Sequence, residues 1–156
     1  MKKFLQKKLK EQKGMTLIEL LAVIVIIAII AAIAIPAIGN IIENSRYSAV
    51  KSDASNVLSA ANIYFTENPD DADGKATLTE LKAGYLESAG KFDEVTTETD
   101  VFVTNANPNQ LTAPAVEFSG GKSLQFTNAS QDQINGDDTK GSEVTANGTK
   151  LIGTAN

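Results

Sequence analysis

The residues of this sequence that could do chemistry are mostly carboxylates, because its 156 residues include neither histidine nor cysteine. Without histidine the chain lacks the usual general base and the commonest metal ligand. Without cysteine it can form neither a disulfide nor a thiolate metal site. The composition therefore weighs against a metalloenzyme and against a serine or cysteine hydrolase. We expect no catalytic residues, no metal and no cofactor.

Glu19 is the carboxylate with the most unusual position. It lies near the start of residues 15–38, a segment that holds no other charged side chain. A carboxylate in such a segment is costly unless it is paired or neutralised. If the chain were cut between Gly14 and Met15, the new amino group of Met15, or that of a neighbouring subunit, would be close enough to neutralise it. The alternative is a glutamate that extends its side chain to the membrane surface.

A second group of carboxylates, Asp71, Asp73 and Glu80, has the spacing of three positions in an EF-hand calcium loop. The first position of that loop would be Pro69, which has no side-chain oxygen. We therefore interpret residues 68–75 as a solvated loop without a metal site.

The element that must position Glu19 is a membrane-spanning helix. Residues 20–35 are all Leu, Ala, Val or Ile, and about 20 apolar residues are enough to cross a bilayer. Residues 1–14 have a net charge of +5, whereas the remainder has −10. Basic flanks stay in the cytoplasm, so we expect a single pass with the N-terminus inside and the C-terminus outside. The alternative is an ordinary cleaved signal peptide, which would have a shorter apolar core.

The acidic remainder bears on possible partners. Phosphate contacts need Lys and Arg, and the chain beyond residue 14 offers no basic stripe. We predict no direct nucleic-acid binding.

The helical pattern continues beyond the membrane segment. Apolar residues recur with a period of 3.6 from Ile38 to Phe65. Residues 39–67 should therefore form an amphipathic second half of the same helix, which needs a small domain to pack against. Asn68-Pro69 should end the helix, because proline disfavours helical geometry in the residue before it. Residues 68–156 would form the small domain.

Pro36 is a weak point inside this helix. It removes one backbone hydrogen bond and clashes with the carbonyl four residues earlier. Gly39 weakens the next turn. The two readings are a tolerated kink in a membrane helix and a position at which the helix is meant to bend or melt.

After Gly90 the pattern predicts strands. Residues 115–118 and 123–126 alternate around Gly120-Gly121, and residues 143–146 and 149–152 flank Asn147-Gly148. Both glycine-containing pairs suit tight hairpins. We predict an α+β fold: a long N-terminal α-helix, its membrane half followed by its amphipathic half, packed on a small antiparallel β-sheet head domain. The residues expected inside are Val116, Phe118, Leu124, Phe126, Val144 and Leu151.

Lys13-Gly14-Met15-Thr16-Leu17-Ile18-Glu19-Leu20, followed by the long apolar run, resembles the processing site of type IV prepilins. In that family a prepilin peptidase cuts a basic leader after its last glycine and methylates the new N-terminal residue. The resemblance implies that residues 1–14 are the leader, that the cut follows Gly14 and that Met15 is methylated. Family pilins often begin with Phe, and Met15 departs from that.

The same resemblance gives roles to two further residues. Glu19 would pair with the N-terminus of a neighbouring subunit in the filament, and Pro36 would correspond to the helix-breaking proline of the family. Both residues would then act in assembly.

The function implied is that of a structural, non-enzymatic subunit of a type IV pilus, built from copies of this chain. The implied partners are other pilin subunits, the prepilin peptidase, the assembly platform protein and its ATPase, and the membrane. The protein would reside in the bacterial inner (cytoplasmic) membrane before assembly and in the cell-surface pilus after it. Type II secretion pseudopilins and competence pilins are related alternatives. A bitopic membrane protein with an exposed ligand-binding domain is the alternative from another class.

Overall fold

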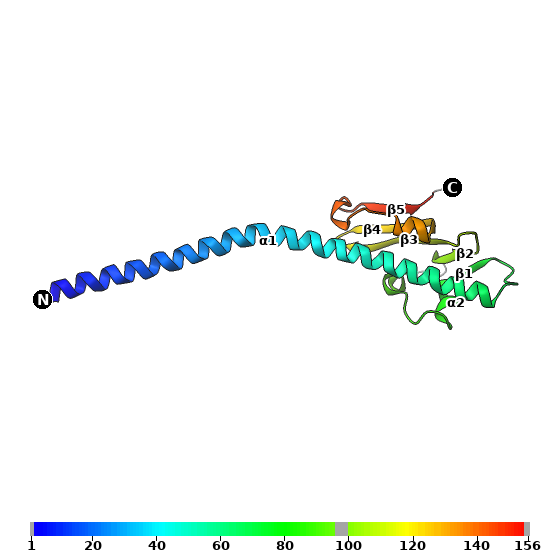
Figure 1. Cartoon of the computed structure of the whole chain (residues 1–156), viewed down its shortest axis with the longest axis horizontal. Helices are drawn as coiled ribbons and strands as arrows, with labels where there is room; N and C mark the ends of the chain where they lie inside the picture. Colours follow the sequence, from blue (N-terminus) through cyan, green and yellow to red (C-terminus); the bar gives the residue numbers. More distant parts are fainter. Residues whose placement is uncertain (1, 96–99, 155–156) are drawn as a thin grey trace. The chain divides into compact units, whose positions relative to one another are not determined.

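The computed structural model describes residues 2–95 and 100–154, with side chains from Thr16 onward. The chain divides into two compact units, Met1–Gly39 and Asn40–Asn156, which we call the N-terminal unit and the C-terminal unit. Helix α1 (Lys2–Glu67) supplies the first and contributes to the second (Figure 1).

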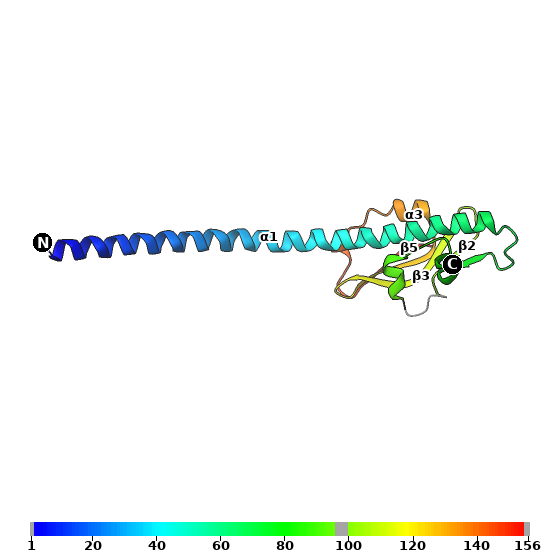
Figure 2. The same ribbon diagram turned by 90° about the horizontal axis from the view of Figure 1, so that it is seen from below.

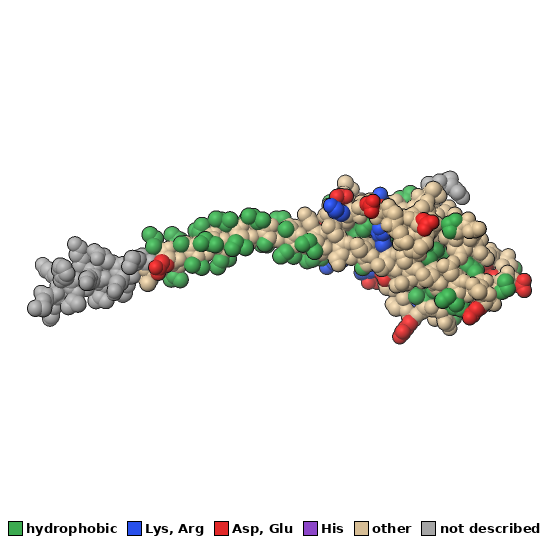
Figure 3. Space-filling view, viewed as in Figure 1, with side chains coloured by type: hydrophobic (Ala, Val, Ile, Leu, Met, Phe, Trp, Pro, Cys, Tyr) green, Lys and Arg blue, Asp and Glu red, His purple; other side chains and the backbone are tan. Residues whose placement is uncertain are grey.

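The described part of the N-terminal unit is a helix with apolar side chains on every side. Its large aliphatic side chains are 50–71% exposed, and Figure 3 shows them covering this stretch of α1. Among the described residues, α1 is the one helix that is long and apolar enough to cross a membrane, judged by length and composition. The all-aliphatic sequence thus forms a helix whose described large side chains are exposed.

The C-terminal unit contains one five-stranded sheet with the strand order β1-β2-β3-β4-β5. Its first four strands pair antiparallel, and β5 pairs parallel to β4. The strands are β1 (Lys75–Thr77), β2 (Phe102–Thr104), β3 (Gln110–Ser119), β4 (Lys122–Ser130) and β5 (Thr149–Gly153). The short helices are α2 (Leu78–Lys82), η1 (Gly90–Glu94), α3 (Gln131–Asn135) and η3 (Gly141–Glu143).

The predicted hairpin around Gly120-Gly121 is confirmed. Ser119 pairs with Lys122 across the turn, and φ is +50° at Gly120 and +79° at Gly121. A two-residue turn with positive φ at both central residues is the type I′ turn, which matches the twist of the flanking strands. Helix α2 opens with a capping box, in which Thr77 and Glu80 bond each other's backbone amides.

The second predicted hairpin is wrong. Asn147 has φ +56° and the amide of Gly148 bonds the carbonyl of Thr145 over 2.9 Å, so the turn forms. Residues 143–146, however, form no strand. The chain between β4 and β5 passes through α3 and η3, and this crossover lets β5 pair parallel to β4, with Gln125 opposite Leu151. The α+β class is confirmed, but the sheet is mixed rather than antiparallel.

The core lies between the sheet and one face of α1, which run side by side in Figures 1 and 2. The α1 residues buried there are Tyr47, Val50, Ala54, Val57, Leu58, Ala60, Ala61 and Phe65. The buried stripe therefore starts at Tyr47, whereas Ile38, Ile41 and Ile42 are exposed. The helix ends as expected, with the amide of Asn68 bonded to the carbonyl of Tyr64 immediately before Pro69.

One expected core residue is on the wrong side of its strand. Leu151 is 43% exposed, whereas Ile152 is 3% exposed. Successive side chains of a strand point to opposite faces. In the observed pairing of β5 with β4, Ile152 faces the core and Leu151 faces away from it. The other expected core residues are buried: Val116, Phe118, Leu124, Phe126 and Val144.

Candidate functional site

The sequence-predicted residues near the N-terminus lie on one short stretch of α1. Gly14, Met15 and Glu19 fall within the helix, and Met15 and Glu19 are about 6 Å apart along the axis at the usual helical rise. The Glu19 side chain is exposed among the exposed side chains of Ile18 and Leu20. The side chains of Gly14 and Met15 lie outside the described part of the structure.

Pro36 also lies inside α1, about 26 Å from Glu19 along the axis. It has no N–H to donate to the carbonyl of Ala32. A Cβ at Gly39 would meet nothing within 4 Å. The structure thus places Glu19 and Pro36 on one helix, but not in one site.

A cluster around Asp137 was missed at the sequence level. The phenol of Tyr47 donates a 2.5 Å hydrogen bond to Oδ2 of Asp137, and the hydroxyl of Thr139 donates a 2.8 Å bond to Oδ1. The ammonium nitrogens of Lys51 and Lys150 lie 3.5 and 3.4 Å from the same carboxylate. The side chain of Asp137 is only 10% exposed. We call these five residues the Asp137 cluster.

The cluster perturbs two ionisable groups. Burial raises the pKa of Asp137, but the hydrogen bonds from Tyr47 and Thr139 and the charges of Lys51 and Lys150 outweigh it, so that the pKa is below its ordinary value. Burial and the hydrogen bond to Asp137 raise the pKa of Tyr47 above its ordinary value. The arrangement holds a carboxylate ionised between two cations and joins segments of the chain that are distant in sequence.

One signal in the sequence pointed toward this cluster. Tyr47 and Lys51 are four residues apart and so share one face of α1. A lysine beside the buried stripe calls for a carboxylate partner, but nothing local identifies that partner as Asp137.

The carboxylates tested for calcium have local structural roles. Asp71 accepts a 2.9 Å hydrogen bond from the phenol of Tyr64, and Asp73 accepts one of 2.9 Å from the amide of Lys75. Glu80 completes the capping box. Across residues 16–95 and 100–154, no three His, Cys, Asp or Glu side chains are grouped to hold a metal ion.

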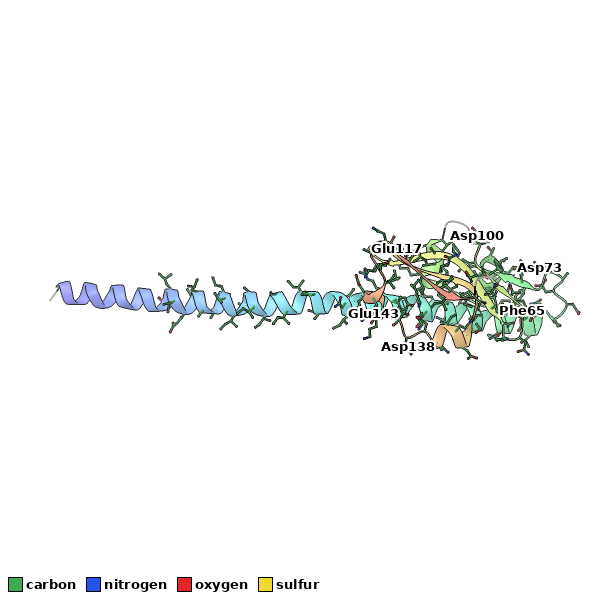
Figure 4. All side chains as sticks on the ribbon, turned by 90° about the horizontal axis from the view of Figure 1, so that it is seen from above. Phe65, Asp73, Asp100, Glu117, Asp138 and Glu143 are labelled. Carbon is green, nitrogen blue, oxygen red and sulfur yellow. The ribbon has the colours of Figure 1, made fainter. Side chains whose placement is uncertain are left out.

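The remaining acidic side chains are dispersed over the C-terminal unit. Those labelled in Figure 4 come from different segments of the chain and are exposed: Asp73, Asp100, Glu117, Asp138 and Glu143. They are typical of a solvated surface.

Comparison with known proteins identifies the N-terminal segment. Residues 9–35 match the family model of the prokaryotic N-terminal methylation motif, the hallmark of type IV prepilin-like proteins. In this segment the chain is similar to type IV prepilin-like proteins, a family that is structural rather than catalytic. The motif and the apolar helix together fit a protein anchored in the inner membrane. No curated protein and no solved structure matches the chain.

Proposed function

We propose that this chain is the precursor of a type IV pilin, a structural and non-enzymatic subunit of a surface filament. It is inserted in the membrane, cleaved after Gly14, methylated at the new N-terminus of Met15 and assembled through α1. The observation that carries the proposal is that the methylation motif leads directly into a helix whose described apolar side chains are exposed.

The proposal assigns a task to each part of the chain. Residues 1–14 are a basic leader that stays in the cytoplasm. Residues 15–38 span the membrane and later form the filament core. Residues 39–67 carry the helix into the domain outside the membrane, and residues 68–156 complete that domain.

The exposed apolar side chains of α1 support assembly through this helix. Surface of this kind must be covered, first by lipid and then by the same helices of neighbouring copies. Small side chains on one helix let another approach closely, which strengthens packing where lipid offers no hydrophobic driving force. The helix supplies them as Ala28, Ala31, Ala32 and Ala34.

Glu19 supplies the specificity of the packing. Its nearest source of positive charge is an amino group created by cleavage, either its own or that of Met15 in the next subunit. Two unit charges about 4 Å apart attract by about 4 kcal/mol at an effective dielectric constant of 20. Desolvation offsets part of this. The remainder favours docking only where carboxylate and amine meet, so the pair sets the axial register of the subunits.

The partners follow from this life cycle. The chain meets the prepilin peptidase and then the platform protein and ATPase that assemble the pilus, and afterwards it meets other pilin subunits at the cell surface. Its net charge of −10 beyond residue 14 offers no footprint for nucleic acid.

Processing is tested with two glycine variants expressed with the assembly machinery. Gly14→Val blocks close approach of the peptidase to the backbone, so its membrane-bound chain should keep the leader. Gly39→Val makes the same change in α1 outside residues 9–35 and should be processed normally. Mass spectrometry of membrane fractions distinguishes precursor from a shortened chain that carries one added methyl group. Normal processing of Gly14→Val would refute the cut site.

Assembly is tested with Glu19→Val in a strain that lacks the native gene. The variant should insert and be cleaved, yet electron microscopy of sheared surface material should show few or no fibres. Glu11→Val is the matched control, because Glu11 leaves with the leader and its fibres should be normal. Glu19→Asp should be intermediate, since the shorter side chain misplaces the charge. Abundant fibres from the processed Glu19→Val variant would show that assembly does not need Glu19. A wild-type chain that stays uncut in the membrane would favour a bitopic membrane protein.

A further inference from the structure

The segment 137–144 lies against the first turns of α1 in the C-terminal unit. Asp137 engages Tyr47 and Lys51, as described above. Five residues further on, the backbone amide of Ser142 donates a 2.9 Å hydrogen bond to the side-chain oxygen of Asn44. The carbonyl of Asp137 also accepts a hydrogen bond from the ammonium group of Lys51. The segment is therefore fixed to α1 at Asp137 and at Ser142.

Between these two points the segment touches the helix backbone. Gly141 is buried, and a Cβ built on it would lie 2.8 Å from Cβ of Tyr47 and would collide with the backbone carbonyl of Glu43. Real Cβ atoms do not approach so closely, so a side chain here would push the segment off the helix. Glycine is required at this position by close approach rather than by its φ angle.

Lys122, the first residue of β4, contacts both α1 and the segment 137–144 from the side of the sheet. Its ammonium nitrogen lies 2.8 Å from Oε2 of Glu43 and 3.4 Å from the carbonyl oxygen of Gly141. The side chains of Lys122 and Glu43 are mostly buried. The attachment points on α1 are thus Glu43, Asn44, Tyr47 and Lys51, which span two turns of the helix.

Among the described residues, none makes a comparable set of contacts to the helix immediately before Glu43. Pro36 cannot donate its backbone hydrogen bond, Gly39 has low helix propensity, and Ile38, Ile41 and Ile42 are exposed. β-branched isoleucine adds little helix propensity of its own. The boundary between weakly supported and attached helix therefore falls between Ile42 and Glu43.

We propose that residues 137–144, together with Lys122, form a clamp that confines any unwinding of α1 to residues before Glu43. If the weak stretch around Pro36 is bent or pulled, α1 then unwinds only as far as the clamp. The buried residues from Tyr47 onward stay helical. The proposal depends on contacts within the C-terminal unit and holds whether or not the chain forms a pilus.

Hydrogen exchange of the full chain in detergent micelles, read by mass spectrometry, tests the clamp. In the wild-type chain, amides 44–51 should exchange more slowly than amides 37–42. Asp137→Asn and Gly141→Ala should each speed exchange of amides 44–51 by about tenfold or more, since each disrupts contacts of a charged or closely packed group. Amides of β3 and β4 should keep their protection.

A matched control is Asp93→Asn, which removes the 2.9 Å ion pair to Lys82 and should leave amides 44–51 unchanged. If Asp137→Asn and Gly141→Ala also expose β3 and β4, Asn44→Ala decides, because it deletes a single hydrogen bond of the clamp and should still speed exchange of amides 44–51 severalfold. Wild-type amides 44–51 that exchange as fast as amides 37–42 would overturn the proposal. So would clamp variants that leave amides 44–51 as protected as in the wild-type chain.

Discussion

The phenol of Tyr47 donates a 2.5 Å hydrogen bond to the carboxylate of Asp137 across a separation of 90 residues in the chain. The ring of Tyr47 also meets Phe118 edge to face, with 5.3 Å between ring centroids. One side chain thus joins the helix both to the apolar core and to the charged cluster at its margin.

Tyr47→Phe separates these two contributions, because it keeps the ring and removes the hydroxyl. Hydrogen bonds to charged groups contribute roughly 1.5–3 kcal/mol, so the free energy of unfolding should fall by about that amount. Chemical denaturation followed by near-ultraviolet circular dichroism measures it. Tyr85→Phe removes the same hydroxyl from an exposed bond to Glu67 and should change stability by less than about 0.5 kcal/mol. Equal losses for both variants would contradict the structure.

The lowered pKa of Asp137 predicts the direction of acid sensitivity. Its folded pKa is below the ordinary value of about 3.9, so its carboxylate stabilises the fold above that pH, and the contribution is lost as pH falls through the folded value. The stability difference between the wild-type chain and Asp137→Asn should therefore narrow as pH falls from above to below about 3.9, the ordinary value. Denaturation curves across this range measure it, and a constant difference would count against an ionised Asp137 in the folded state.

The three tyrosines should all ionise late in the folded chain. A hydrogen bond to Asp71 raises the pKa of Tyr64 to about 12. A hydrogen bond to Glu67 raises the pKa of Tyr85, and burial raises that of Tyr47. In the folded chain, phenolate absorbance should therefore appear only at a pH well above about 10, the ordinary pKa of tyrosine. The contacts that raise these pKa values stabilise the fold as long as the tyrosines are protonated. Their contribution to the free energy of unfolding is therefore present below about pH 10 and is lost as pH rises through the folded pKa values. A native titration that superimposes on that of the denatured chain would refute this.

Neighbouring residues of β5 should respond very differently to truncation. Ile152 is buried and Leu151 is largely exposed. Ile152→Ala should cost about 2–5 kcal/mol, the usual range for a buried aliphatic side chain, whereas Leu151→Ala should cost less than about 1 kcal/mol. Thermal unfolding of the two variants tests the parallel pairing directly. If Leu151→Ala lowered the melting temperature more than Ile152→Ala, Leu151 would face the core, as in the hairpin expected from sequence.

The parts of the fold that sequence predicted are those determined by adjacent residues. Gly120-Gly121 specifies its turn and the pairing of Ser119 with Lys122, although the register shifts further along β3 and β4. Asn147-Gly148 specifies a turn equally well, but the choice of partner for β5 depends on β4, across the crossover that contains α3. No residue near the turn indicates which strand pairs with β5. For this reason the sequence predicted Leu151 in the core, where the structure has Ile152.

The same distinction separates the two sites. Gly14, Met15 and Glu19 lie within six consecutive residues, so their spacing can be read directly, and the matched motif covers all three. The Asp137 cluster draws Tyr47 from α1 and Lys150 from β5. Its geometry exists only after the sheet has formed, and the acidic pair Asp137-Asp138 alone looks like ordinary surface.

The sheet of the C-terminal unit is terminated by two short strands, β1 with three residues and β5 with five. Each carries a lysine, Lys75 and Lys150. Short, charged edge strands resist pairing with strands of other molecules, which is the usual route to aggregation. Copies of this domain can therefore be crowded together at high local concentration while their sheets stay separate, because neither edge offers a long row of unpaired backbone groups.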